Sequence, residues 1–428
     1  MPQIKNWNFF TLLTVVFVII MPFYVILKVF FEHKLWIQNF WIFIKELLII
    51  ILWITVIYEF IRNKVLPKID ILDILVLAFI GYGIWITLYL NLWLEYIIYG
   101  WRYDFVFLWI LLLYKHWAQF LKISWQEVIK YFLISASISL FLGLMVKFLF
   151  KESRLIFFGF SDYASNWTFS WSVPTHHWLE NSGIKRFQWI LEWPNAMGYF
   201  LIVYAALVLH IQKVKLQFQN VAFLVLVLWM VIITYSRSAL LWIWVAWVSL
   251  FLLNIKFIYY RLKKYIIPII ISILIIVGWL WYVFQDKIYS AVIRPGSTTG
   301  HFERMEIGIL RFQWQPLGSW LATSGPAFRN VYPEKTTRED EEYYIPESWF
   351  IQVLTEWWIV YFSLFILIFL TLLLKTYRKS PMIFGALIAV IIMNIFLHIF
   401  ESTHLTYAFF LILGIIFYEN KKTLQKKK

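Results

Sequence analysis

Apolar runs of about 20 residues recur along the whole 428-residue chain. Each is long enough to cross a bilayer as a helix, because lipid offers the backbone no hydrogen-bond partner outside the helix itself. Hydrophobic residues make up 62% of the chain and charged residues only 14%, against about 25% charged in soluble domains. The sequence therefore predicts an all-α fold, a polytopic transmembrane helical bundle of about twelve spans. The runs lie near residues 9–31, 41–60, 71–90, 104–121, 128–150, 195–212, 219–235, 239–256, 265–284, 350–374, 383–399 and 403–418.

Basic residues fall in alternate connections between these runs and in the lysine-rich segment 421–428. Short cytoplasmic loops carry such an excess of lysine and arginine, so this pattern orients the spans and places both termini on the cytoplasmic side. The distribution also explains the net charge of +14 as membrane topology. We therefore expect membrane lipids as partners and no nucleic acid.

Two long segments on the opposite, outer side differ from the rest of this single integral membrane domain (1–428). They are residues 151–194 and residues 285–348, the second between spans 9 and 10, and both are rich in glycine, proline, serine, threonine, histidine and arginine. Loops of this length in a compact protein usually carry function. The larger loop is the predicted location of the functional site.

The stretch HFERMEIGILRF in the larger loop holds the best candidates for chemistry. Histidine is the side-chain type that ordinarily changes its charge near neutral pH, so His301 is a candidate general base or acid. Arg304 and Arg311 carry permanent, forked donors that suit phosphate. At helical spacing His301, Arg304 and Gly308 share one face. An ordinary amphipathic helix with a solvated basic face is the alternative. Glu347 follows at the end of the same loop.

Two further arginines lie near the ends of spans. Arg237, in TYSRSALLW, occupies a tight outer turn between two runs. It either extends to lipid headgroups, as such arginines commonly do, or holds an anionic ligand in an outer cavity. Arg102, in GWRYDF, lies beside Asp104, and the two charges either neutralise each other or leave Arg102 to bind an anion.

Several segments, in order, resemble the bacterial superfamily of O-antigen ligases and polysaccharide polymerases. The resemblance covers roughly residues 95 to 375. It is carried by GWRYDF at 100–105, RFQWILEWPNAMGYFL at 186–201, TYSRSALL at 234–241, GHFERMEIG at 300–308, QPLGSWLATSGP at 315–326 and PESWFIQVLTE at 346–356. The late position of the large outer loop also fits this superfamily.

The resemblance implies a metal-independent glycosyltransferase or ligase of the bacterial cytoplasmic (inner) membrane that needs no cofactor. Its donor would be a glycan linked to undecaprenyl diphosphate, and its acceptor a saccharide or a lipid-linked saccharide. Fixed arginines can stabilise a diphosphate leaving group. We predict His301 or Glu347 as the base that takes the proton from the acceptor hydroxyl. Arg237, Arg304, Arg102 and Arg311 are the predicted diphosphate ligands.

The alternative is a flippase or transporter of a lipid-linked oligosaccharide. Transporters place ionisable groups near the middle of their spans and show repeated halves. Here the polar groups concentrate in the outer loops, and no internal repeat is visible. The sequence therefore favours the transferase, and it leaves ligase and polymerase as open alternatives.

Tryptophan is unusually frequent, at 26 residues against 15 glycines, whereas glycine normally makes up about 7% of residues. In the motifs that resemble the superfamily, tryptophan stands at five positions where we expect glycine: 189, 193, 242, 320 and 358. A bulky ring at tight turns and close helix contacts should disrupt packing. Our hypothesis is that the gene uses UGA for glycine and that these codons have been read as tryptophan. Aromatic belts at the membrane interfaces are the alternative.

Overall fold

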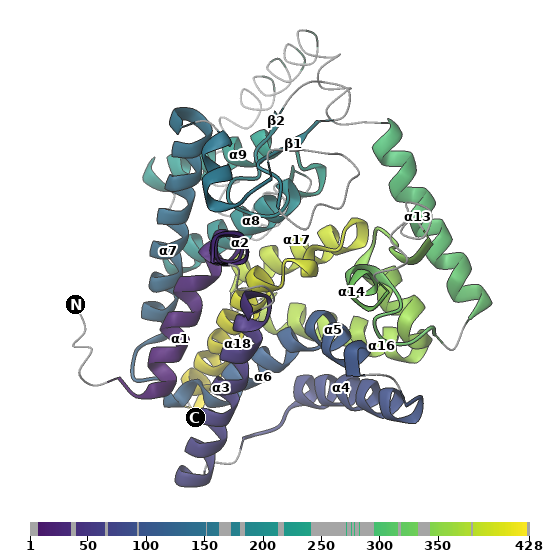
Figure 1. Cartoon of the computed structure of the whole chain (residues 1–428). Coiled ribbons are helices and arrows are strands. Elements are labelled where there is room, and N and C mark those ends of the chain that lie inside the picture. Colours follow the sequence, from purple (N-terminus) through teal and green to yellow (C-terminus); the bar gives the residue numbers. More distant parts are fainter. Residues whose placement is uncertain are drawn as a thin grey trace.

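The structure is a computed structural model. It describes residues 7–35, 40–64, 67–91, 94–150, 152–161, 173–179, 185–212, 218–240, 295–315, 318–332, 343–377 and 380–425, together with residues 271, 275, 278 and 282. The described chain is mostly helical, as predicted, with one two-stranded antiparallel sheet (Figure 1).

The first half contains α1 (Phe9–Ile20), α2 (Tyr24–Lys34), α3 (Phe40–Asn63), α4 (Ile71–Tyr89), α5 (Leu94–Asp104), α6 (Val106–Trp117) and α7 (Trp125–Met145). The hairpin β1 (His177–Trp178) and β2 (Lys185–Arg186) follows. The second half contains α8 (Pro194–Gln212), α9 (Phe218–Thr234), α13 (Pro295–Trp314), α14 (Phe328–Val331), α16 (Trp349–Tyr377), α17 (Pro381–Phe396) and α18 (Thr403–Gln425).

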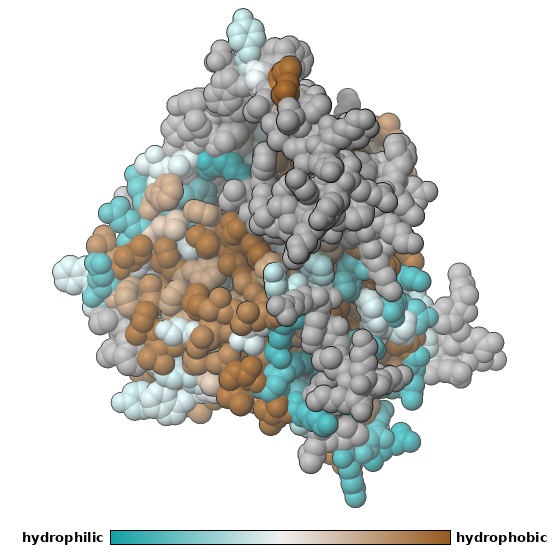
Figure 2. All heavy atoms as spheres, turned by 180° about the vertical axis from the view of Figure 1, so that it is seen from behind, coloured by the Kyte–Doolittle hydropathy of each residue, from teal (hydrophilic) through white to brown (hydrophobic). Residues whose placement is uncertain are grey.

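Five helical segments of the described chain are long and apolar enough to cross a membrane: Phe9–Lys34, Ile71–Tyr89, Trp125–Phe150, Pro194–Ile211 and Ile359–Tyr377. A sixth arises if α5 and the helix after it, which are bent by 56°, form one broken span. Many apolar side chains of α4 and α16 are exposed, and Figure 2 shows a broad hydrophobic face. The chain is therefore a membrane protein. The predicted spans 239–256 and 265–284 lie almost entirely outside the described residues, so the count of twelve stays a prediction.

The core is centred on the contact between α6 and α18. Phe107 of α6 packs edge-on against Phe410 of α18, with ring centroids 4.7 Å apart. Gly414 permits this close approach, because a Cβ there would lie 2.6 Å from the carbonyl oxygen of Leu111. Small residues let helices approach closely in membranes, where apolar burial between helices gains little over contact with lipid.

A cluster of ion pairs joins α4, α6 and α16. Lys115 Nζ lies 2.5 Å from Asp73 Oδ1 and 2.9 Å from Asp70 Oδ1, while Lys375 Nζ lies 2.9 Å from Asp70 Oδ2. Asp70 also caps α4 by accepting from the backbone N–H of Leu72. The carboxylate of Asp70 thus joins Lys115 of α6 to Lys375 of α16.

The segments predicted as outer loops contain regular structure. The hairpin of β1 and β2 lies at the top of Figure 1, and the C-terminus lies at the bottom. The helical spacing predicted for HFERMEIGILRF is confirmed, because the stretch is part of α13, and the predicted span near 195–212 is matched by α8, which begins at Pro194.

Two of the five anomalous tryptophans occupy backbone positions that glycine favours. The φ angle is +62° at Trp189 and +64° at Trp320. This left-handed region is strained for residues that carry a Cβ, at about 1–2 kcal/mol, and is open to glycine. Trp193 directly precedes α8, whereas Trp242 and the side chain of Trp358 lie outside the described residues. The recoding hypothesis stays a prediction, with support at residues 189 and 320.

Candidate functional site

One face of α13 packs against the segment that leads into α16. Arg304 Nη1 donates to Glu347 Oε1 at 2.8 Å, and His301 Nδ1 lies 3.3 Å from Glu347 Oε2. One turn further along, Gly308 faces Pro346, to whose Cβ an added Cβ would lie 2.9 Å. The face predicted from spacing is therefore the face that joins α13 to Glu347, and it is not simply a solvated basic face.

Arg186, at the end of β2, is held by the turn that follows α9. Its Nε donates to the carbonyl oxygen of Thr234 at 3.1 Å, and its Nη2 donates to Asn195 Oδ1 at 3.2 Å and to the carbonyl oxygen of Tyr235 at 3.4 Å. The φ angle of Tyr235 is +50°, which turns the chain sharply at this point. The guanidinium of Arg186 is thus oriented by backbone groups and has little freedom to move.

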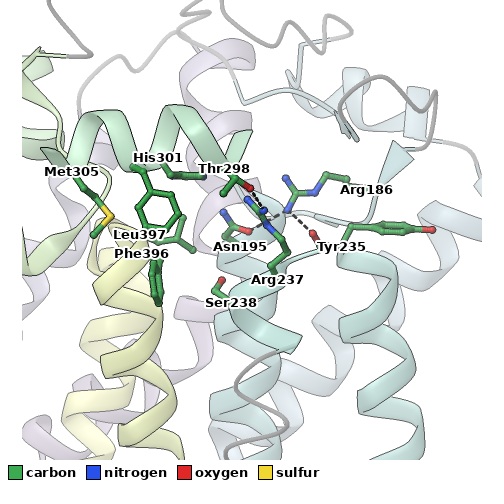
Figure 3. A pocket seen from close by; sticks show the side chains of 11 residues that line it. Arg186, Asn195, Tyr235, Arg237, Ser238, Thr298, His301, Met305, Phe396 and Leu397 are labelled. Carbon is green, nitrogen blue, oxygen red and sulfur yellow. Dashed lines mark hydrogen bonds between the residues drawn. The ribbon is translucent and has the colours of Figure 1, made fainter. Parts of the chain in front are cut away.

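Arg237 follows the same turn and extends toward α13. Its Nη1 donates to Thr298 Oγ1 at 2.6 Å. Figure 3 shows the guanidinium groups of Arg186 and Arg237 close together, next to Thr298 and Asn195. The predicted tight turn is therefore present, and it directs Arg237 to the larger loop segment, where the site was predicted.

These arginines line a first pocket, a cavity of about 280 Å³. His301 contributes to the same wall, and Phe302, Met305 and Phe396 form an apolar part of the lining. Among the described residues that line it, Arg186 and Arg237 carry full charges and no carboxylate is present. The first pocket therefore combines a cationic end with an apolar side.

A second pocket of about 250 Å³ adjoins the first, and the two share Arg186, Asn195, His301 and Leu397 in their linings. The further lining groups of the second pocket include six polar or charged side chains: His177, Arg329, Glu347, His398, Glu401 and Ser402. His301 thus stands in the wall between a cationic cavity and a cavity of mixed charge.

The protonation of three lining groups follows from their surroundings. Burial alone would raise the pKa of Glu347, but the hydrogen-bonding partner His301 and the charge of Arg304 lower it to about 2. Burial lowers the pKa of His177 and of His398 to about 4 in each case. At neutral pH Glu347 is therefore a weakly basic carboxylate, and both of these histidines are neutral.

Three predicted diphosphate ligands lie away from the lining of both pockets. Arg304 pairs with Glu347, whose other carboxylate oxygen lies beside His301. Arg102 Nε lies 3.0 Å from Glu46 Oε1, and Lys45 Nζ lies 3.3 Å from the same oxygen.

Arg311 is 7% exposed, and its guanidinium lies over the rings of Tyr343 and Tyr344. Its Nη2 donates to Ser319 Oγ at 3.3 Å. These contacts hold the turn after α13 in place. Of the four arginines predicted to bind diphosphate, only Arg237 lines a described pocket.

Arg186 is not among the predicted site residues, although it lies in the motif RFQWILEWPNAMGYFL. Asn195, Thr298, Arg329, His398 and Glu401 also line the pockets without having been predicted. The one signal in the sequence for Arg186 was Asn195, which follows it by nine residues in RFQWILEWPN. Side chains at the start of a helix can bond to the segment that precedes the helix.

No protein-family model matches the chain, and no curated protein matches it. A function for this chain therefore depends on the chemistry of the two pockets.

Proposed function

We propose that the protein transfers a glycan from undecaprenyl diphosphate to a hydroxyl group of an acceptor saccharide, at the outer face of the bacterial cytoplasmic membrane. The observation that carries the proposal is the first pocket. Two arginines and one histidine converge there beside an apolar wall, in a protein with membrane-spanning helices. A lipid diphosphate matches that combination, because it joins a strongly anionic group to a long apolar chain.

Arg186 and Arg237 are the diphosphate ligands in this proposal. The hydrogen bonds of Arg186 to Asn195 and to the turn after α9 orient it before the substrate arrives. Preorganised donors stabilise charge that develops in a transition state without the cost of reorganising them. Both arginines are therefore suited to stabilise a departing diphosphate.

His301 is the base, and Glu347 orients it. Glu347 is the weaker candidate for the base, because its pKa of about 2 makes it a poor proton acceptor at neutral pH. A carboxylate beside one ring nitrogen favours the tautomer that leaves the other nitrogen free to accept a proton. With Nδ1 of His301 beside Glu347, Nε2 is left to take the proton.

The reaction is a single displacement at the anomeric carbon of the donor. The acceptor oxygen forms a bond to that carbon as the bond between the carbon and the diphosphate oxygen breaks. The hydroxyl proton goes to His301 Nε2, and the electron pair of the broken bond leaves with undecaprenyl diphosphate. Arg304 keeps Glu347 ionised throughout, since its guanidinium contacts the carboxylate at 2.8 Å.

The test is glycan transfer by the purified protein in lipid nanodiscs, with an undecaprenyl diphosphate glycan, a saccharide acceptor and EDTA. We expect transfer by the wild type and a loss of about 100-fold or more for Arg237→Ala, His301→Ala and Glu347→Ala, as for other groups that stabilise charge or move protons. Arg154→Ala is the matched control, because Arg154 is exposed and lies outside both pockets. Full transfer by all three site variants would refute the proposal.

A further inference from the structure

We propose that the second pocket binds the acceptor, that the acceptor is a neutral saccharide, and that His398 and Glu401 determine its specificity. This inference rests on the proposed function, because an acceptor is needed only if the first pocket holds the donor. It names the class of the acceptor and two residues that bind the acceptor but take no part in the bond-making step.

The charges of the two pockets differ in a way that separates their ligands. The lining of the first pocket includes Arg186 and Arg237 and, among the described residues, no carboxylate. The lining of the second pocket holds Arg186 and Arg329 together with the carboxylates of Glu347 and Glu401, of which Glu347 is also paired with Arg304. The first pocket therefore attracts an anion, whereas the carboxylates of the second pocket repel it and offset the attraction of the arginines there. A ligand rich in hydroxyl groups and without charge suits the second pocket.

His398 offers unused hydrogen-bonding capacity to that ligand. Both of its ring nitrogens are buried, and neither makes a hydrogen bond of good geometry to a described residue, although the backbone groups of Pro346 and Ser348 lie close enough to affect its pKa. Buried polar atoms are rarely left unpaired, so each such atom points to a missing partner. A neutral imidazole presents one donor and one acceptor, and a sugar hydroxyl can satisfy either of them.

Glu401 and Arg329 provide a second recognition group. Arg329 Nη1 lies 3.5 Å from Glu401 Oε1, and their side chains are 32% and 29% exposed. Ser402 lies beside them in the lining. A carboxylate accepts hydrogen bonds from two neighbouring hydroxyls, and a guanidinium donates to others. Such a pair binds a diol without adding net charge to the pocket.

The shared wall connects this binding to the chemistry. His301 and Asn195 line both pockets. A saccharide held by His398 and Glu401 therefore has a hydroxyl within reach of the base that faces the donor. Holding two reactants on either side of one base converts a bimolecular step into an effectively unimolecular one.

The experiment measures the dependence of transfer on acceptor and on donor concentration separately, with a panel of neutral and uronic-acid octyl glycosides as acceptors. We expect the wild type to use neutral glycosides. For Glu401→Gln and for His398→Asn we expect the acceptor KM to rise about tenfold or more, as for the loss of a hydrogen bond to a charged or buried group. The donor KM should stay within about twofold.

The matched control is Glu303→Gln, because Glu303 is an exposed carboxylate of α13 outside both pockets. We expect unchanged values of both KM. An unchanged acceptor KM in both site variants, a changed donor KM, or a preference for the anionic glycosides would overturn the acceptor assignment alone. Absence of transfer by the wild type to every glycoside would overturn the proposed function itself, so the two failures are distinguishable.

Discussion

Replacing Trp189 or Trp320 by glycine and, separately, by alanine distinguishes the effect of the backbone conformation on stability from the effect of the indole ring. Both replacements remove the same indole, so the difference between the glycine and the alanine variant reports the backbone conformation. At a φ of +62° or +64°, alanine carries the left-handed penalty of about 1–2 kcal/mol and glycine does not. We therefore expect each glycine variant to be more stable than its alanine counterpart by about 1 kcal/mol or more.

Trp85 is the matched control. It is 57% exposed and lies inside α4, where glycine is less favourable than alanine by about 1 kcal/mol. The difference should therefore have the opposite sign at this position. Thermal unfolding in one detergent measures all three pairs, and the expected separation within a pair is about 1–2 °C. Alanine variants as stable as the glycine variants at both turns would refute the backbone argument.

The recoding hypothesis has its own test in the native protein. Peptide mass spectrometry of material from the source cells identifies the residue at each suspect codon. We expect glycine at positions 189, 193, 242, 320 and 358. Tryptophan at positions 193 and 320 would reject the hypothesis, whatever the stability measurements show.

Two further predictions concern α13. Gly308→Ala should destabilise the protein by about 1–3 kcal/mol and reduce transfer, because the added Cβ would lie 2.5 Å from Ile351 and 2.9 Å from Pro346. Gly300→Ala should have neither effect, because no atom lies within 4 Å of a Cβ at that position. Equal effects of the two variants on thermal unfolding and on transfer would contradict this packing. Glu347 has a pKa of about 2 against an ordinary 4.5, so its ionised form adds stability, up to about 3 kcal/mol, that is present above pH 4.5 and is lost as the pH falls through about 2. Glu347→Gln should lack that pH dependence in unfolding measured between pH 5 and 2, and an identical pH profile of wild type and variant would contradict the contacts of Glu347 with His301 and Arg304.

Local patterns predicted the parts of the site that lie on one helix. The spacing of His301, Arg304 and Gly308 placed them on one face of α13, because three and four residues make about one helical turn. These features depend only on neighbours in the sequence.

The other parts of the site depend on contacts between residues that are far apart in the chain, and these could not be predicted from the sequence. Arg186 belongs to the site because the turn after α9, 48 residues later, accepts its hydrogen bonds. Arg102 was predicted as a phosphate ligand, but Glu46 of another helix lies at its guanidinium. Arg311 has the chemistry of an anion ligand, yet it is buried against two tyrosine rings. The sequence shows where an arginine is, whereas the group that pairs with it is known only from the packing of the helices.

The most direct measurement of the central claim is the lipid product of the reaction. Purified protein in nanodiscs is supplied with a donor labelled in the glycan and in the lipid, together with a neutral octyl glycoside. The proposed function predicts that each transferred glycan is matched by one molecule of undecaprenyl diphosphate, and that Arg237→Ala lowers both products equally. Release of undecaprenyl monophosphate, or movement of the intact donor across the bilayer without any glycan transfer, would contradict it.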